Sequence, residues 1–273
     1  MSSQDLTTLA ALKNWLGLPA TASPSDSTLS ALVTAASRAI CAWLGRPGLL
    51  PQTYIDACDC ESPRVFLRQW PVLQINSVTL DGFAVPAAAL SVGGPVNGYL
   101  LKPADNAPPG APQALDMFDR KASRRRQNLS VNYLAGYAVI REAQTAPASA
   151  PWTLAVNQPY GPWANDLGVF YTASGLPLTP VAAAPNVGQY CVGAGAYLFA
   201  AADADASLQI SYGFTPQDIA QAALELAAER FRAADRIGLR SKSIGGQETI
   251  SYDGSAISAP ILAMLQPYKR VAV

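Results

Sequence analysis

The sequence predicts an α+β fold: a small helical bundle, made of an N-terminal helix pair and a long C-terminal helix, with packed β-strands and an inserted all-β module. Apolar residues recur at helical spacing near both ends of the chain, whereas the middle holds short β-branched or aromatic segments bounded by Gly, Pro and Asp. A third observation is a low-complexity Ala/Pro/Ser/Thr stretch at 143–151, within a region that has no Lys or Arg. We expect a core from 1–140 and 207–273, with helices in 1–45 and 214–273, strands in about 50–140, and the inserted module at 141–206.

Two helices are predicted before residue 46. The first carries leucines at spacings of three and four from Leu6 to Leu16 and ends at Gly17. The second ends at Gly45, before Pro47, and has one apolar stripe: Leu29, Leu32, Val33, Ala36, Ile40, Trp43 and Leu44. Because two helices alone bury little surface, their apolar faces must meet other elements.

The middle of the chain favours strands at 53–57, 64–69, 74–80 and 129–134. The segment Leu208-Gln-Ile-Ser-Tyr-Gly213 echoes Leu129-Ser-Val-Asn-Tyr-Leu134, since each is a strand that ends in Tyr near a Gly. Further short strands are predicted between these two segments, at 168–171, 188–192 and 196–199. We therefore interpret 141–206 as an insertion into a host core that resumes after Tyr212.

A long helix is predicted after Tyr212, with Thr215 as its cap and Pro216 in its first turn. Its faces are rich in alanine, which permits close approach of other helices, and Gly238 ends it. A polar stretch at 241–254 then leads to a short helix at 259–266 and a basic, apolar tail.

Composition limits the possible functions. Only 14% of the residues are charged, where about 25% is usual, and the formal net charge is zero. A chain this poor in charge must hide surface, for example at a subunit interface, and it lacks the overall charge of a nucleic-acid or membrane binder. Histidine is absent, which removes the commonest general base and metal ligand. We predict no enzyme activity and no catalytic, cofactor-binding or metal-binding residues.

The chain has no feature of a secreted or membrane protein. Its first residues lack a signal-peptide pattern, and no apolar run reaches the roughly 18 residues that span a bilayer. Its four cysteines are sparse and irregularly spaced, which indicates reduced thiols. We expect the protein to be made in a cytoplasm and to have no membrane partner.

Three small motifs have structural explanations that outweigh the chemical ones. Cys58-Asp-Cys60 lacks the second ligand pair of a zinc site. Asp203-Ala-Asp205, with Asp166 in the same region, could serve a calcium loop or a glycosidase, but a tight turn explains both neighbouring aspartates. The glycine pairs fit no phosphate-binding pattern.

A basic cluster is the most informative charge feature: Arg120, Lys121, Arg124, Arg125 and Arg126. It could contact DNA in a channel, meet the acidic region 142–229 across a subunit boundary, or form a solvated hairpin tip. The sequence leaves these three interpretations open.

The order of motifs resembles the head–tail connector (adaptor) proteins of tailed phages. The residues that carry the resemblance lie in 1–82 and 207–273: Ile40-Cys-Ala-Trp-Leu-Gly-Arg46, Gln69-Trp-Pro-Val-Leu-Gln-Ile-Asn-Ser-Val78, Leu80-Asp-Gly82, Tyr212-Gly-Phe-Thr-Pro216, Ser241-Lys-Ser-Ile-Gly-Gly246 and Leu265-Gln-Pro-Tyr-Lys-Arg270. In that family a helical bundle docks on the portal, and copies close into a ring, usually of twelve.

The resemblance implies a structural virion protein of the neck, between capsid and tail, that is assembled in the host cytoplasm. It would form a homo-oligomeric ring on the portal protein, extend the DNA channel, contact packaged DNA non-specifically and provide the attachment site for a tail terminator or other tail protein. It also implies that the C-terminal segment binds the portal, through Ser241, Lys242, Ile244, Tyr252, Tyr268, Lys269 and Arg270. The basic cluster would then line the channel or join neighbouring subunits.

Two other functions stay open at this stage. A tail or baseplate module could recognise a host surface through the β insertion. A glycoside hydrolase could use Asp166, Asp203 or Asp205, because carboxylates alone suffice for that reaction.

Overall fold

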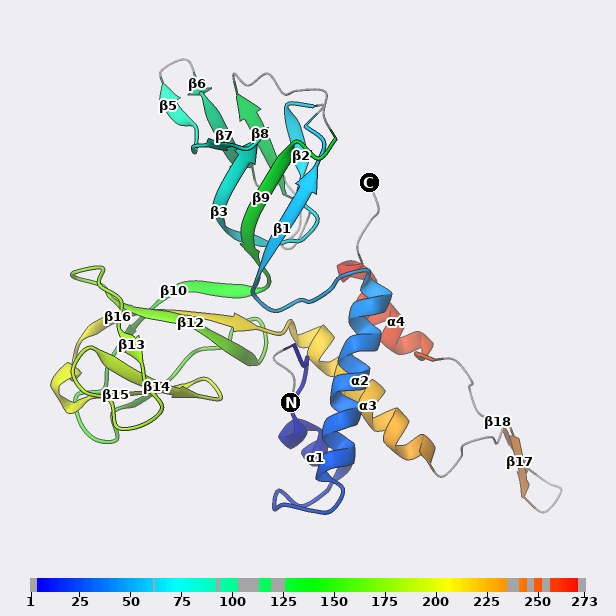
Figure 1. Ribbon diagram of the computed structural model, residues 1–273. Helices are drawn as coiled ribbons and strands as arrows, with labels where there is room; N and C mark the ends of the chain where they lie inside the picture. Colours follow the sequence, from blue (N-terminus) through cyan, green and yellow to red (C-terminus); the bar gives the residue numbers. More distant parts are fainter. Residues whose placement is uncertain are drawn as a thin grey trace. The chain divides into compact units, whose positions relative to one another are not determined.

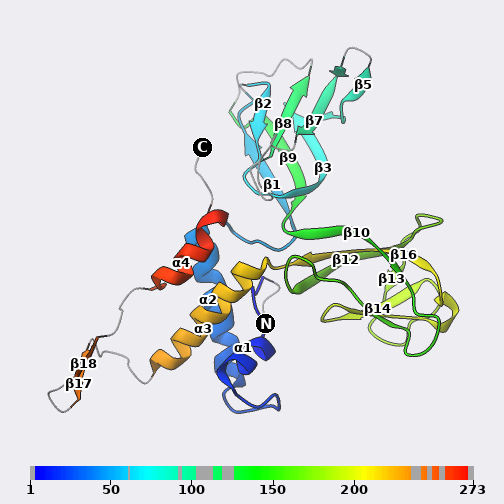
Figure 2. The same cartoon turned by 180° about the vertical axis from the view of Figure 1, so that it is seen from behind.

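The computed structural model describes residues 4–60, 62–91, 94–102, 113–118, 126–234, 241–244, 248–251 and 256–269. These residues form helices and mainly antiparallel sheets (Figures 1 and 2), which confirms the mixture of α and β structure predicted from the sequence. They divide into two compact units. The helical unit draws on Met1–Leu49, Gln158–Pro162 and Thr215–Val273, and the β unit on Leu50–Asn157 and Trp163–Phe214.

The helical unit contains α1 (Leu9–Leu16), α2 (Asp26–Leu44), α3 (Gln217–Ala233) and α4 (Ala259–Leu265), and α4 runs into the 3₁₀ turn η3 (Gln266–Tyr268). α3 packs against each of the other three helices, and α1 also packs against α2 (Figure 1). The helices that begin the chain and those that end it therefore cover one another's apolar faces. Buried side chains on these faces include Leu12, Leu29, Val33, Ile40, Leu44, Ile219, Ala223, Leu226, Ile261 and Leu265.

The ends of the first two helices follow the sequence signals. The Thr8 hydroxyl accepts a hydrogen bond from the Ala11 amide at 3.1 Å and so caps α1. Both α1 and α2 end at a glycine in the left-handed conformation, with φ of +71° at Gly17 and +68° at Gly45. Glycine adopts this conformation without the steric cost that a side chain would add.

The start of α3 differs from the prediction that Thr215 caps it. Pro216 occupies the cap position, and the first free amide, that of Gln217, donates to the carbonyl of Tyr160 at 3.2 Å. The loop 158–162 can approach so closely because Gly161 has no side chain. A Cβ there would lie 2.0 Å from the Thr215 carbonyl oxygen.

α2 is the one helix, among the residues described, that is long and apolar enough to cross a membrane by length and composition. Core helices of soluble proteins meet the same test. The α2 face that carries Leu29, Val33 and Ile40 is buried in the helical unit.

The first β core belongs to the part of the β unit before residue 136. One antiparallel sheet has the order β1 (Gln52–Cys58), β9 (Leu129–Ala135), β3 (Val72–Leu80) and β4 (Phe83–Val85). A second has the order β2 (Arg64–Phe66), β8 (Ala114–Phe118) and β7 (Gly98–Lys102), and β5 (Ala89–Ser91) pairs with β6 (Gly94–Val96). Alternate residues of β9 point into this core, where Leu129, Val131 and Tyr133 are fully buried.

The second β core lies between residues 138 and 214. One sheet has the order β10 (Ala138–Thr145), β16 (Ser207–Phe214) and β12 (Trp163–Tyr171). The other has the order β11 (Thr153–Ala155), β15 (Ala196–Phe199), β14 (Gln189–Gly193) and β13 (Thr179–Pro180), and only the β13–β14 pair is parallel. The 3₁₀ turn η1 (Ala201–Asp203) precedes β16. Val169, Tyr190, Tyr197 and Ile210 are among its buried residues.

The predicted module boundaries fall inside a sheet of this second core. β10 begins before residue 141 and pairs with β16, which begins after residue 206. The strands predicted in about 50–140 lie in the β unit rather than in the unit formed by the helices. Independent folding of an inserted module at 141–206 stays a prediction.

The two segments that echo each other in the sequence are β9 and β16, each an inner strand of an antiparallel sheet. Their tyrosines, Tyr133 and Tyr212, are completely buried. Each donates its hydroxyl at 2.7 Å to a carboxylate on the neighbouring edge strand, Asp56 on β1 and Glu142 on β10. In both sheets the acid lies opposite the residue two positions before the tyrosine. The echo therefore marks one local arrangement used twice.

Candidate functional site

The last of the predicted portal-binding residues lie against the helical unit. The Tyr268 hydroxyl donates to Asp218, in the first turn of α3, at 3.3 Å. The Lys269 ammonium lies 4.6 Å from the centre of the Trp43 ring, a cation–π contact with α2. These two contacts, with the buried Ile261 and Leu265, dock the C-terminal helix onto α2 and α3.

The connection from α3 to α4 is fixed at both ends. α3 ends at Ala233, and the Ser258 hydroxyl just before α4 donates to Glu229, one turn before that end, at 3.0 Å. Within the connection, β17 (Ser241–Ile244) pairs with β18 (Glu248–Ser251) as an antiparallel hairpin. The predicted residues Ser241, Lys242 and Ile244 thus belong to β17. Tyr252 and Arg270 lie outside the described residues.

Most of the basic cluster, namely Arg120, Lys121, Arg124 and Arg125, also lies outside the described residues. Arg126 is exposed in the turn that leads into β9. Next to it, the Gln127 amide donates to the Asp59 carboxylate. This hydrogen bond fixes the turn of Arg126 and Gln127 to the first β core.

An ion cluster lies on the first β core. Arg64 holds Asp116 through two hydrogen bonds of 2.7 and 3.0 Å, and the Lys102 ammonium lies 3.4 Å from the same carboxylate. The hydrogen bond from Arg64, with a smaller contribution from Lys102, keeps the pKa of Asp116 below its ordinary value. This carboxylate joins β2, β8 and β7, so its role is structural.

The aspartates considered for catalysis are held by tyrosines. Asp166 accepts hydrogen bonds from the Tyr197 hydroxyl at 2.9 Å and from Tyr190, and Asp203 accepts one from Tyr171 at 2.6 Å. Backbone amides complete both sites, from Gly168 to Asp166 and from Gly188 to Asp203. Because both oxygens of each carboxylate are occupied by protein donors, these aspartates are arranged for packing. Asp205, by contrast, is exposed in the turn before β16.

Burial and these hydrogen bonds change the acidity of the tyrosines. Burial first, and the hydrogen bond to Asp203 second, raise the pKa of Tyr171 to about 12. Burial, with the negative charge of Asp166 nearby, also raises the pKa values of Tyr190 and Tyr197 well above the ordinary value. The sequence showed these tyrosines and acids but gave no signal of their pairing, because the partners are 24 to 32 residues apart.

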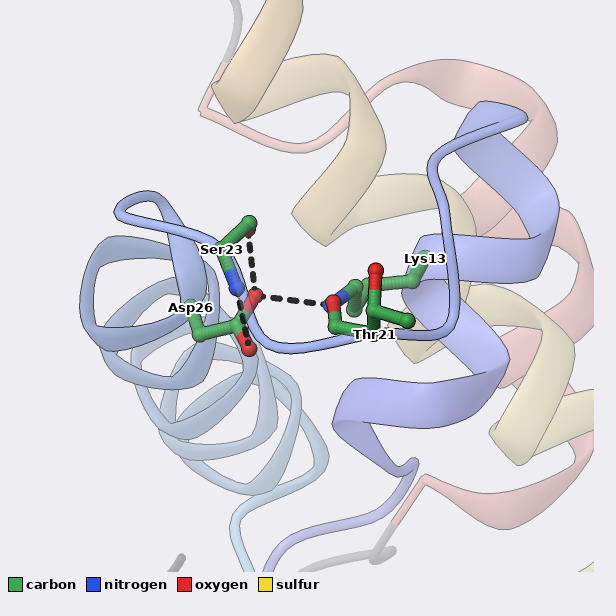
Figure 3. Close-up of polar contacts among 4 residues, drawn as sticks. All are labelled: Lys13, Thr21, Ser23 and Asp26. Atoms are coloured by element: carbon green, nitrogen blue, oxygen red, sulfur yellow. Dashed lines mark hydrogen bonds and ion pairs between the residues drawn. The ribbon is translucent and has the colours of Figure 1, made fainter.

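A buried lysine fixes the loop between α1 and α2 (Figure 3). The Lys13 ammonium donates to the Thr21 carbonyl at 2.6 Å and to Asp26 at 2.9 Å, and the Ser23 hydroxyl donates to the same carboxylate at 2.7 Å. The hydrogen bonds from Ser23 and then from Lys13 lower the pKa of Asp26 to about 2. Sequence reasoning missed this contact, although a lysine beside Leu12 on a largely apolar helix was a possible signal.

The cysteines are free thiols. Burial raises the pKa of Cys41 and of Cys60, and burial with the nearby charge of Asp56 raises that of Cys58 to about 11. Such thiols are poor nucleophiles and poor metal ligands at neutral pH. Within the described part of the chain, no group of three or more His, Cys, Asp or Glu residues is placed to hold a metal ion.

No protein-family model matches the chain, and no curated protein matches it. Among solved structures, it is similar to one described as the neck of an empty gene transfer agent (GTA) particle, computed with C6 symmetry. The two share 14% sequence identity with a TM-score of 0.38, over 100% of this chain and 94% of that chain.

Proposed function

We propose that this chain is a structural protein of a phage-like particle: a head-to-tail connector in the neck that forms a ring on the portal, extends the DNA channel and offers an attachment site to a tail protein. In this proposal it has no enzymatic activity. Its partners are the portal, further copies of itself, a tail terminator or similar protein, and packaged DNA.

One observation carries the proposal. The order of elements matches the order of motifs in the sequence resemblance: a helix pair, strands, a long helix after Phe214, a hairpin and a short last helix. The first and last of these pack together, so the helical parts of the two sequence regions that resemble connectors, within 1–49 and 215–273, meet in one unit. A helical bundle of this composition is what the resemblance implies for the part that docks on a portal.

We assign portal binding to the hairpin of β17 and β18, with Ser241, Lys242 and Ile244, and to the residues that follow it up to Tyr252. Both ends of this connection are fixed beside the end of α3, so the hairpin can reach a partner without release of α4. Tyr268 and Lys269 hold α4 in place in this proposal and position the hairpin. The basic cluster 120–126 would face DNA or a neighbouring subunit.

Native mass spectrometry of the full chain, alone and mixed with the portal ring from the same genome, tests the proposal. We expect a shift to about a dozen bound copies, because repeated interfaces around a closed ring add their affinities. A chain that stays free in the presence of the portal would contradict the connector assignment and favour a module that recognises a host surface.

A variant of the hairpin tests whether this segment binds the portal. Replacing 241–251 by a Gly/Ser linker of equal length should abolish portal binding and leave the helical unit folded, because the contacts of Ser258 and Lys269 remain. The matched control replaces the exposed loop 182–184 in the same way and should bind normally. Normal binding by the hairpin variant would show that the portal contact lies elsewhere.

A further inference from the structure

The second β core is almost without charge, and most of the charge that it has is used internally. Between residues 138 and 214 there are five charged residues: Arg141, Glu142, Asp166, Asp203 and Asp205. Glu142, Asp166 and Asp203 each accept a tyrosine hydroxyl. One cation and one carboxylate remain, Arg141 and Asp205, and both are exposed. Among the described residues, neither of these two side chains has an ion-pair partner.

Arg141 is held in an unusual backbone conformation. It lies in a β-bulge of β10, where Ile140 and Arg141 oppose the single residue Ser211, and its φ is +55°. It is the one non-glycine residue with positive φ inside a strand of the described chain. The buried Ser211 hydroxyl accepts the Arg141 amide at 3.0 Å and stabilises this conformation. Bulges of this kind redirect a side chain, and backbone strain of this kind concentrates at functional positions.

The bulge places Arg141 on the outer face of the β10–β16–β12 sheet. Its guanidinium lies 6.0 Å from the centre of the Phe170 ring, on the opposite edge strand, so the side chain extends across β16. The register puts Ala143 and Phe170 on either side of Gln209, and Thr145 beside Ser207. The strand residues on this face are therefore uncharged except for Arg141.

Asp205 lies at the other end of the same sheet. Its amide donates to the carbonyl of Ala146, just after β10, and its own φ is +58°. Ser207, which follows the turn of Asp205, lies four positions along β16 from Ser211, which is beside Arg141. The two charges are thus roughly 13 Å apart along the strand, at about 3.3 Å per residue.

We propose that this face pairs with the same face of a second copy, with Arg141 of each copy bound to Asp205 of the other. The face is self-complementary: it has one charge of each sign at opposite ends and uncharged side chains between them. A two-fold contact brings unlike charges together twice, whereas any other partner would have to supply both charges. The contact with the Phe170 ring already restricts the guanidinium, so less side-chain freedom is lost on pairing.

The pair should be weak. Three strands offer less than the roughly 800 Å² per partner of a standard interface, so association should depend on concentration and on salt. This two-fold contact differs from the rotational contact of a ring and does not rest on the proposed function. It describes the chain before it meets a portal.

Sedimentation velocity of the full chain over a wide concentration range tests the pairing. We expect a reversible dimer, at least about tenfold weaker in Arg141→Glu and in Asp205→Arg, because each single reversal brings like charges together twice. The double variant R141E/D205R restores both attractions and should dimerise like the natural chain. Arg38→Glu, an equal charge change at an exposed position on α2, should have no effect.

A chain that is monomeric at every concentration, or a double variant as weak as the single ones, would overturn the pairing. If R141E lost DNA binding while its dimerisation stayed unchanged, Arg141 would contact DNA phosphates and not Asp205 of a second copy. That result would equally overturn the pairing. Portal binding of R141E, measured in parallel, should remain normal. Its loss together with the dimer would mean that one contact serves both purposes, against the two-fold arrangement.

Discussion

The two β cores share one local arrangement but treat charge in opposite ways. Both have a central strand whose buried tyrosine donates to an acid on the edge strand, Tyr133 to Asp56 and Tyr212 to Glu142. The sequence from 50 to 135 contains 15 charged residues, including the described ion cluster of Arg64, Asp116 and Lys102, whereas 138 to 214 contains five. The first core thus pairs acids with cations as well as tyrosines, and the second pairs three of its acids with tyrosines.

This difference shows how a domain can hold buried and half-buried acids without cations. A tyrosine hydroxyl donates a hydrogen bond to the carboxylate, and the tyrosine ring adds apolar area to the core. The hydrogen bond offsets the desolvation of the acid, and no cation is needed at the surface to pair with it. The surface of the second core is consequently nearly neutral. A surface of that kind suits contact with other protein, and it leaves the two remaining charges free to determine orientation.

The largest effect is expected when the carboxylate with the most tyrosine donors is removed. Asp166→Ala leaves the Tyr190 and Tyr197 hydroxyls and the Gly168 amide without their acceptor, and both tyrosines are at most 1% exposed. Loss of several buried hydrogen bonds should lower the unfolding free energy of the second core by about 3 kcal/mol or more. Hydrogen exchange of the amides in β12, β14 and β15 measures this locally.

Asp205→Ala is the matched control, since it removes an aspartate of the same core whose side chain makes no hydrogen bond or ion pair within the described chain. In dilute protein, this substitution should change the free energy of opening, measured by hydrogen exchange, by less than about 0.5 kcal/mol. Equal effects of the two substitutions would mean that the tyrosine contacts of Asp166 contribute nothing to stability.

Alkaline pH should separate the two cores next. The second core has three tyrosines with raised pKa values, Tyr171, Tyr190 and Tyr197, and the first core has Tyr133. A tyrosine with a raised folded pKa stabilises the fold fully below its unfolded value near 10, and this stabilisation is lost as the pH rises toward the folded value.

Between pH 10 and about 12, the folded second core therefore keeps up to three protons that its unfolded chain releases, and the folded first core keeps one. The stability of the second core should therefore fall with pH about three times as steeply as the stability of the first core. Hydrogen exchange or limited proteolysis at increasing pH would show the order of unfolding. Earlier loss of the first core would contradict this assignment of tyrosine environments.

Local elements followed from the sequence more readily than long-range partners did. The helical periodicity of Leu29 to Leu44 and the glycines at 17 and 45 located α2 and the ends of both helices, because these signals act within a few residues. Even the equivalence of β9 and β16 was visible as an echo. The partners of Tyr133 and Tyr212, however, depend on strand order, which hydrophobic spacing does not specify.

The same distinction applies to the candidate site. A basic-apolar C-terminus was evident, but the contact of Lys269 with Trp43 and of Tyr268 with Asp218 depends on how α4 packs on α2 and α3. The β module was predicted to begin at residue 141 because the composition changes there, but this boundary falls inside β10, and β10 pairs with β16 beyond the other predicted boundary at 206. Arg141 was passed over because a β-bulge has no reliable sequence signal when it contains no glycine.

A smaller effect is expected when either of the two repeated tyrosine–acid hydrogen bonds is removed, and the comparison shows whether both contribute equally to stability. Tyr133→Phe and Tyr212→Phe each remove one hydroxyl and keep the buried ring, so each should lower stability by about 1–2 kcal/mol in its own core. Urea unfolding followed by local hydrogen exchange gives both values. A much larger cost at Tyr133 would be informative, because its oxygen also accepts the Gln69 amide at 3.0 Å.

The smallest effect is expected in the ion cluster that only the first core has. Arg64 is half exposed, with 53% of its side chain accessible, so Arg64→Ala should cost at most about 1 kcal/mol, and less in high salt. The sign of its pH dependence follows from the lowered pKa of Asp116: the stabilisation is present above the ordinary carboxyl range and is lost as the pH falls through the folded value. In R64A this loss should be smaller, while the acid response of the second core stays unchanged because its carboxylates have no cation partner among the described residues. Thermal unfolding of both proteins at neutral and acidic pH, in low and high salt, measures the difference; a salt effect confined to the second core would reverse the comparison between the two.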